Sequence, residues 1–282
     1  MKILRIESTD GATHLGRLHA DGSRTRLEGS LLGPESFRGL RDTGDPLPEG
    51  RPLAPIDPVD LLCIGLNYQK HAEEGGKPTP EHPVVFRKST AAVAAPGEPI
   101  QLPRRLRSDR VDYECELVVV IGRACKNVAA ADALDYVLGY TCGNDVSARD
   151  WQKMAGGGQW CRGKTFDTFA PLGPCLVTPA RGGESDGESI ANPNALRIST
   201  VLNGQTMQDW TTEDMIFDVP TLIEFLSGST TLLPGTAIFT GTPHGVGFAR
   251  TPPVWLQPGD TVTVAIEGIG QLTNPVVEEP GV

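Results

Sequence analysis

Short apolar runs separated by turn-forming residues recur along the chain and predict a mostly β protein. Leu117 to Ile121 is a continuous apolar run rich in β-branched residues, which is the pattern of a buried strand. Asn203-Gly204, between two further apolar segments, is the strongest hairpin signal in the chain. We therefore expect strands over 59–66, 84–88, 117–121, 196–202, 205–208, 237–240 and 261–267.

Helical periodicity is scarcer than strand-like alternation. Residues 129–140 have the apolar spacing of a helix. Shorter helices are expected over 147–152 and 221–226, together with a single helical turn around 70–74 that Gly75-Gly76 would end. The pattern thus favours a fold in which helices are few and short.

The first part of the chain differs from the rest in the positions of its turn-forming residues and prolines. Turn signals at Asp10-Gly11 and Asp21-Gly22 separate short alternating segments, which predicts a small β meander. Five prolines then crowd a stretch with few helix or strand formers, namely Pro46, Pro48, Pro52, Pro55 and Pro58. We place a domain boundary there, between a small N-terminal β domain over 1–55 and a larger domain over 56–282.

Composition and charge narrow the classes of partner. The 282 residues carry 25 Lys and Arg against 35 Asp and Glu, a net charge of −10, which argues against binding to nucleic acid or to an anionic membrane surface. The sequence has no signal-peptide layout and no apolar run of membrane-spanning length, so a cytoplasmic protein is expected. Its six scattered cysteines form no C-x-x-C pair and are expected to be buried thiols.

Two carboxylates, Glu114 and Glu116, stand directly before the central apolar run. Residues i and i+2 of a strand share a face, so their negative charges would lie close together and repel unless a cation sits between them. A divalent metal is one explanation. The other is that both side chains lie at the solvated end of a strand that becomes buried only from Leu117 onward, and the spacing alone does not choose between the two.

A second candidate pair combines a histidine with a glutamate. His71 and Glu74 are three residues apart, which makes them neighbours on one face of a helical turn. A carboxylate beside an imidazole fixes its tautomer and raises its basicity, as a general base that activates water requires. The alternative is an exposed surface histidine among exposed acids. Prolines follow soon after, so residues 70–83 are expected to form a lid.

Further polar candidates lie beyond the central strand. Asp145 lies between a strand-like and a helix-like segment, where it could present a third oxygen ligand. Arg149 and Gln152 share one face of the helix expected at 147–152. The glycine-rich stretch 156–167 lacks the spacing of a phosphate-binding loop, so we expect no nucleotide site there.

Taken together, five motifs in this order resemble the fumarylacetoacetate hydrolase family. They are IGLNYQKHAEE at 64–74, DYECELVVVIG at 112–122, GYTCGNDVSARDWQ at 139–152, GKTFDTFAPLGP at 163–174 and TGTPHGVG at 240–247. The resemblance covers the chain from about residue 56 onward. It implies an α+β fold that is mostly β, a mixed β-sandwich roll with a small N-terminal β domain, and a homodimer.

The resemblance also implies roles for particular residues. Glu114, Glu116 and Asp145 match metal ligands, His71 and Glu74 match a pair that handles water, and Lys164 matches a lysine beside the substrate; Arg149, Gln152 and Thr240 match substrate-contacting positions. The chain departs from the family pattern at Ser89, where many members have proline, and at His244, where a small residue is more common. His244 is expected to narrow or polarise the pocket for the substrate tail.

The implied activity is hydrolysis of a carbon–carbon bond in a ketonic substance. An acylpyruvate or other 2,4-diketo acid would yield pyruvate and a second acid, with His71 deprotonating the attacking water. Ligands that are all carboxylates favour a hard cation, Mg²⁺ first, with Mn²⁺ or Ca²⁺ able to substitute. Two alternatives stay open: an isomerase or decarboxylase (a lyase) of unsaturated 2-oxo diacids such as 2-hydroxyhepta-2,4-diene-1,7-dioate, and a non-catalytic binding protein that keeps the fold.

Overall fold

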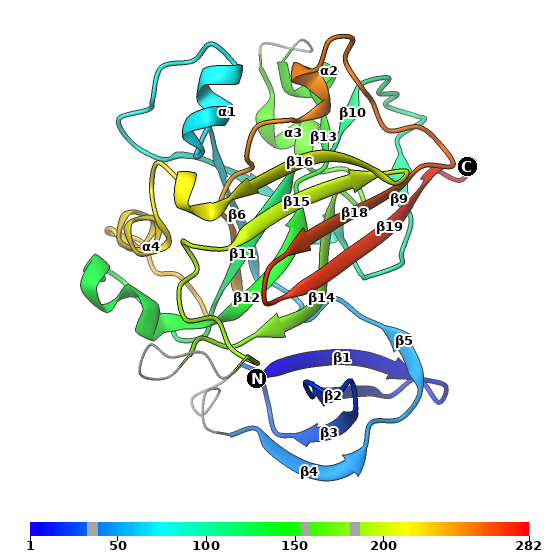
Figure 1. Ribbon diagram of the computed structural model, residues 1–282, viewed down its shortest axis with the longest axis vertical. Helices are drawn as coiled ribbons and strands as arrows, with labels where there is room; N and C mark the ends of the chain where they lie inside the picture. Colours follow the sequence, from blue (N-terminus) through cyan, green and yellow to red (C-terminus); the bar gives the residue numbers. More distant parts are fainter. Residues whose placement is uncertain (33–38, 154–157, 181–186, 282) are drawn as a thin grey trace.

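Two β-sheets pack against each other around the apolar run at 117–121 (Figure 1). The computed structural model describes residues 1–32, 39–153, 158–180 and 187–281. The path of the large sheet is, in order, β4 (Arg41–Pro46), β3 (Arg24–Glu28), β2 (Thr13–Leu18), β1 (Lys2–Ser8), β14 (Ala170–Val177), β12 (Val137–Asn144), β11 (Cys115–Ile121), β17 (Thr236–Phe239), β6 (Asp60–Gly65) and β7 (Val84–Lys88). This mostly β architecture with mixed sheets confirms the predicted fold class.

Several small strands complete the sheets. β5 (Gly50–Pro52) pairs with β1, and β8 (Val93–Ala94) pairs with β14. The second sheet runs β16 (Gln205–Thr211), β15 (Arg197–Leu202), β18 (Thr261–Ile266), β19 (Gly270–Glu278) and β9 (Ile100–Leu102), and a separate two-stranded ladder joins β10 (Val111–Asp112) to β13 (Ser147–Ala148). The predicted hairpin at Asn203-Gly204 joins β15 to β16, and both turn residues have positive φ, at 50° and 82°.

The central strand β11 is buried along its whole length and separates two apolar clusters. Val118 and Val120 belong to one cluster, whereas Leu117, Val119 and Ile121 belong to the other, which includes residues of the second sheet. This division follows from the alternation of side chains along a strand. Glu116 is two residues before Val118, so its side chain lies on the same face of β11 as those of Val118 and Val120.

The N-terminal strands β1 to β4 form the predicted meander and lie together at one end of the molecule (Figure 1). β1 also pairs with β14 through Lys2 opposite Val177 and Ile3 opposite Leu176, so the meander extends the large sheet. A boundary at residue 55 stays a prediction.

The remaining helices are short, as expected. α1 (Gln69–Glu74) directly follows β6, whereas α2 (Arg149–Lys153) and α3 (Trp160–Lys164) follow β13. All three lie at the end of the molecule opposite the meander (Figure 1). α4 (Val219–Ser227) contains the predicted helix at 221–226 and packs against the 3₁₀ segment η2 (Ala130–Tyr136).

The helix predicted over 129–140 is wrong in its second half. Only Ala130–Tyr136 is helical, as a 3₁₀ segment, and β12 begins at Val137. All eight residues of β12 are buried between β11 and β14, so sheet pairing prevails over the local periodicity. Apolar spacing therefore did not separate a helix from a buried strand here.

Five of the six cysteines are buried free thiols, as predicted, whereas Cys161 on α3 is exposed. Within the described residues, no helix is long and apolar enough to cross a membrane.

Candidate metal and active site

Three buried carboxylates meet at one end of β11. Glu114, Glu116 and Asp145 each offer an oxygen atom, and these atoms lie within 4.8 Å of one another. Glu116 lies in β11 and Glu114 directly precedes this strand. Asp145 follows the end of the neighbouring strand β12, where its backbone N–H donates to the Glu114 carbonyl at 2.9 Å. All three residues are at most 4 % exposed, so the expectation of a solvated strand end is wrong.

Three buried cations surround these carboxylates. Lys164 donates hydrogen bonds to Glu114 and Asp145, and Lys88 donates to Asp145. Arg149 Nη2 donates to Glu114 Oε1 at 2.6 Å. The arginine also donates to Asp112 Oδ2, at 2.7 Å from Nη2 and 2.9 Å from Nε.

Glu114 and Glu116 differ in how their charges are compensated. Burial alone would raise the pKa of Glu114, but Arg149 and Lys164 hold it well below its usual range. Burial, together with the negative charges of Asp145 and Glu114, raises the pKa of Glu116 well above its usual range. Among the described residues no cation pairs with Glu116, whose carboxylate accepts a hydrogen bond from the Gly241 N–H at 2.8 Å.

This charge pattern fits a divalent cation. Glu116 is a buried carboxylate without a positive partner in the described part of the chain, and it belongs to a cluster of three oxygen donors. Carboxylate oxygens are the ligands that hard cations such as Mg²⁺ prefer. Glu114, Glu116 and Asp145 could therefore hold a divalent metal.

The predicted pair on α1 is present. His71 Nδ1 and Glu74 Oε2 are 3.2 Å apart, and their side chains are 16 % and 23 % exposed. Glu74 Oε1 accepts a second hydrogen bond, from the Gly245 N–H at 3.0 Å. Gly245 has a φ of 93°, and a Cβ there would lie 2.5 Å from the Met207 carbonyl oxygen, so only glycine fits this turn.

These hydrogen bonds set the chemistry of the pair. Burial would raise the pKa of Glu74, but the bonds from His71 and Gly245 lower it overall, so the carboxylate is ionised. An ionised Glu74 accepts a hydrogen bond from Nδ1–H, which leaves Nε2 of His71 as the basic atom.

One cavity of about 120 Å³ joins the pair on α1 to the carboxylate cluster. The predicted site residues that line it are His71, Glu74, Glu114, Glu116, Asp145, Arg149, Gln152 and Lys164. Arg149 and Gln152 share a face of α2, as expected, with Arg149 Nη1 donating to Gln152 Oε1 at 3.1 Å.

Two predicted substrate contacts lie elsewhere. The Thr240 hydroxyl donates to the Leu117 carbonyl at 2.9 Å, and His244 packs edge-on against Trp210, with ring centroids 4.7 Å apart. Neither residue is among those that line the cavity, whereas Thr242 is. Substrate contact by Thr240 and His244 stays a prediction.

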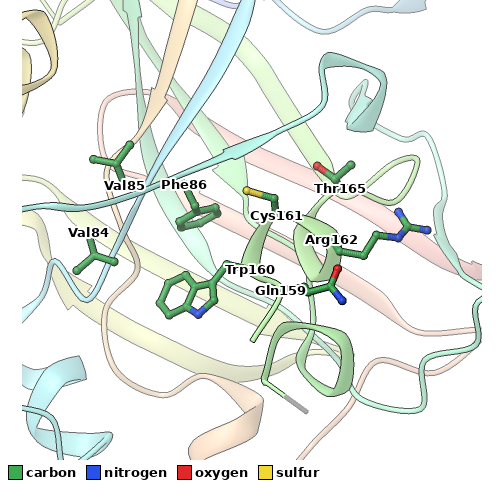
Figure 2. Close-up of a pocket in the computed structure, with 8 residues that line it drawn as sticks. All are labelled: Val84, Val85, Phe86, Gln159, Trp160, Cys161, Arg162 and Thr165. Carbon is green, nitrogen blue, oxygen red and sulfur yellow. The ribbon is translucent and has the colours of Figure 1, made fainter. Parts of the chain in front are cut away.

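Phe86 and Trp160 are also among the residues that line a larger pocket of about 750 Å³ (Figure 2). These two rings pack edge to face at 5.6 Å and line both spaces. The described residues that line this larger pocket include no carboxylate or histidine, so the smaller cavity is the candidate active site.

Sequence reasoning missed several residues of the site. Lys88 shares the inward face of β7 with Phe86, and a charged residue at an inward position was the signal. Asp112 stands two residues before Glu114 in an alternating D-x-E-x-E pattern. It accepts hydrogen bonds from Arg149 and from the N–H groups of Gly247 and Phe248. Asp112 therefore ties α2 to the loop after β17.

Comparisons with known proteins identify the same family that the five motifs resemble. The family model for the fumarylacetoacetate (FAA) hydrolase C-terminal domain matches residues 60–277. A fumarylacetoacetate hydrolase domain-containing protein 2 homolog from Dictyostelium discoideum is 50 % identical over 79 % of this chain and 73 % of its own length. A protein named oxaloacetate tautomerase fahd2, mitochondrial, from Xenopus laevis is 45 % identical over 80 % of this chain and 68 % of its own.

A solved structure is similar to this chain over its whole length. The crystal structure described as 2-hydroxyhepta-2,4-diene-1,7-dioate isomerase from Mycobacterium marinum has a TM-score of 0.80 and 42 % identity, with both chains fully covered.

Proposed function

Because this chain belongs to the fumarylacetoacetate hydrolase family, we propose that it is a metal-dependent enzyme that moves a proton between the keto and enol forms of a small 2-oxo dicarboxylic acid, such as oxaloacetate. One observation carries the proposal: a single small cavity contains both a histidine–carboxylate pair and a buried cluster of three carboxylates. The relatives named as a tautomerase and as an isomerase support this reaction over the carbon–carbon hydrolysis expected from the sequence.

The size of the cavity supports a short substrate. Sites for drug-sized ligands have volumes of roughly 300–1,000 Å³, whereas this cavity measures about 120 Å³. A four- or five-carbon acid suits such a space better than a long acylpyruvate.

The carboxylate cluster would supply the metal chemistry. Glu114, Glu116 and Asp145 would hold a divalent cation, which would supply Lewis-acid chemistry for a 2-oxo acid. We propose Mg²⁺ first, with Mn²⁺ or Ca²⁺ as substitutes, because every protein ligand is a carboxylate.

His71 would move the proton. With Nδ1–H donated to Glu74, Nε2 can take a proton from C3 of the keto acid as the C–H bond breaks. The electron pair of that bond forms the C2–C3 double bond as the π electrons of the carbonyl move to its oxygen. The proton held on Nε2 is then returned to this oxygen, which completes the enol. The reverse sequence regenerates the ketone, so no water or other reactant is consumed.

Lys164 would stabilise the charge that develops on the 2-oxygen. Its ammonium group is buried and fixed between Glu114 and Asp145, so it needs little reorganisation when the substrate gains negative charge. Arg149 and Gln152 would orient the substrate from α2.

Hydrolysis of an acylpyruvate is the second candidate, because the same His71–Glu74 pair could take its proton from water. The products separate the two reactions. Hydrolysis releases pyruvate and a second acid, decarboxylation releases CO₂, and tautomerisation leaves the mass unchanged.

The experiment follows the ultraviolet absorbance of enol-oxaloacetate with Mg²⁺ and with chelator, while pyruvate and CO₂ are measured separately. We expect metal-dependent loss of the enol without excess pyruvate or CO₂. Release of pyruvate from an acylpyruvate, with no effect on the enol, would establish the hydrolase instead.

The expected homodimer and cytoplasmic location belong to this proposal as well. Light scattering of the purified chain tests the first. Fractionation of the source cells tests the second, which matters because the relative from Xenopus laevis carries "mitochondrial" in its name.

A further inference from the structure

Two exposed lysines, Lys77 and Lys153, line the cavity in addition to the buried cations. Lys77 lies just beyond α1, and Lys153 is the last residue of α2, so they approach the cavity from different segments. Among the residues that the structure describes, neither side chain forms an ion pair with a carboxylate. Both are therefore positive charges available to an anion that enters the cavity.

The buried cations are not available in this way. Lys88 contacts Asp145, Lys164 contacts Glu114 and Asp145, and Arg149 contacts Asp112 and Glu114. Each is already neutralised by a carboxylate at hydrogen-bond distance. A second anionic group of the substrate would thus find uncompensated positive charge at the exposed side of the cavity.

The position of Lys153 is defined by an aromatic ring. Its Nζ lies 3.3 Å from the centre of the Phe248 ring, which also lines the cavity. The Phe248 N–H donates to Asp112 Oδ2 at 3.0 Å, and the same carboxylate binds Arg149. The ammonium group is thereby fixed relative to the carboxylate cluster.

The positive charges near Lys153 also favour binding of an anion. Burial, followed by the positive charge of Arg149, lowers the pKa of its amine to about 8, and the nearby charge of Lys77 contributes to the same shift. Two like charges at the edge of one cavity repel each other. A carboxylate between them would relieve that repulsion.

We propose that Lys153, assisted by Lys77, binds the second carboxylate of the substrate and so selects 2-oxo dicarboxylic acids over 2-oxo monocarboxylic acids. This inference rests on the proposed function, since it assumes that the 2-oxo acid end of the substrate faces the carboxylate cluster. Lys153 acts here as a specificity residue, and the proton transfer itself stays with His71.

The test compares two substrates that differ in the second carboxylate. Exchange of the C3 hydrogens in D₂O, followed by proton NMR, reports enolisation of oxaloacetate and of 2-oxobutanoate in the same assay. In Lys153→Gln we expect kcat/KM for oxaloacetate to fall about ten- to a hundred-fold, the range for a lost charge-assisted hydrogen bond. The change should appear in KM, whereas the values for 2-oxobutanoate should not change.

Two further variants complete the design. Lys153→Arg keeps the charge and should retain most of the preference for oxaloacetate. Lys70→Gln removes an exposed lysine of α1 that pairs with Glu73 and does not line the cavity, so it should leave both substrates unaffected. Equal losses for both substrates in Lys153→Gln would assign the lysine a structural role and overturn the inference, as would no loss at all.

A binding measurement separates failure of this inference from failure of the proposed function. The Mg²⁺-bound protein is titrated calorimetrically with 2-oxoglutarate and with 2-oxopentanoate, which has the same length and lacks the terminal carboxylate. Tighter binding of 2-oxoglutarate that disappears in Lys153→Gln would support the inference even if no enolisation occurs. Equal affinities for the two acids in the wild-type protein would overturn it.

Discussion

Glu114 and Glu116 are two residues apart at the start of β11, yet only Glu114 forms ion pairs with neighbouring cations among the described residues. Arg149 and Lys164 both bind Glu114, whereas Glu116 accepts a backbone hydrogen bond and has no cationic partner in the described chain. Their pKa values accordingly shift in opposite directions. A metal ion between the two side chains would compensate the negative charge of Glu116. The difference in charge compensation between Glu114 and Glu116 leads to two contrasting predictions.

Glu116→Gln should abolish stabilisation by metal without harming the metal-free protein. The substitution replaces a buried carboxyl group that has no cationic partner in the described chain by a neutral amide of similar size. Wild-type protein should gain about 2.7 kcal/mol of unfolding free energy at a Mg²⁺ concentration of 100 times Kd. Thermal unfolding with Mg²⁺ and with chelator measures both effects. A variant that Mg²⁺ still stabilises to the wild-type extent would exclude Glu116 as a ligand.

Glu114→Gln should behave differently, because its carboxylate neutralises two buried cations. Each cation keeps one other carboxylate, Asp112 for Arg149 and Asp145 for Lys164. We therefore expect a loss of about 3 kcal/mol, the lower end of the range for a broken buried ion pair. Urea unfolding in chelator tests this, with Glu116→Gln as the matched control. Equal stability of the two variants would contradict the assigned ion pairs.

His71→Ala should remove turnover while metal binding survives. General acid–base groups contribute roughly 10²- to 10⁴-fold to the rate, and His71 lies on α1, outside the carboxylate cluster. The rise in melting temperature on adding Mg²⁺ should therefore match that of the wild-type protein. Glu74→Gln should give a smaller loss, because it alters only the orientation and basicity of the imidazole. Unchanged turnover in His71→Ala would remove this residue from the mechanism.

The sequence predicts the parts of the site that depend on local geometry. The two-residue spacing of Glu114 and Glu116 predicted that their carboxylates lie close together, and helical spacing predicted His71 beside Glu74; the structure has both arrangements. The sequence could not decide whether the glutamates are buried, because that depends on the chains that cover the end of the strand. The same limit explains the error at Val137, where pairing with β11 and β14 determines the structure.

Residues whose roles come from distant partners were harder to identify. Lys88 meets Asp145 across 57 positions of sequence, and Asp112 meets Phe248 across 136. No local pattern specifies such pairs. The hydroxyl of Thr240 likewise donates to the Leu117 carbonyl, 123 positions away in the sequence, and its contact with a substrate stays a prediction.

The preference for a dicarboxylic acid should weaken as pH rises through about 8. Burial, and after it the charge of Arg149, lowers the pKa of Lys153 to about 8; Glu114 and Asp112 oppose this shift, and Lys77 adds a smaller lowering effect. The ammonium form therefore predominates below this pH and is lost above it, whereas substrate carboxylates with pKa values of roughly 4 stay ionised throughout.

The measurement is the ratio of kcat/KM for oxaloacetate to that for 2-oxobutanoate across pH, because taking the ratio cancels any titration that affects both substrates equally. The ratio should decline in the wild-type enzyme near pH 8. In Lys153→Arg it should stay flat, because the guanidinium group remains charged over this range. A bound dicarboxylate stabilises the ammonium form, so kcat for oxaloacetate should change less than kcat/KM. A ratio independent of pH in the wild-type enzyme would show that the charge of Lys153 does not contribute to binding of the second carboxylate.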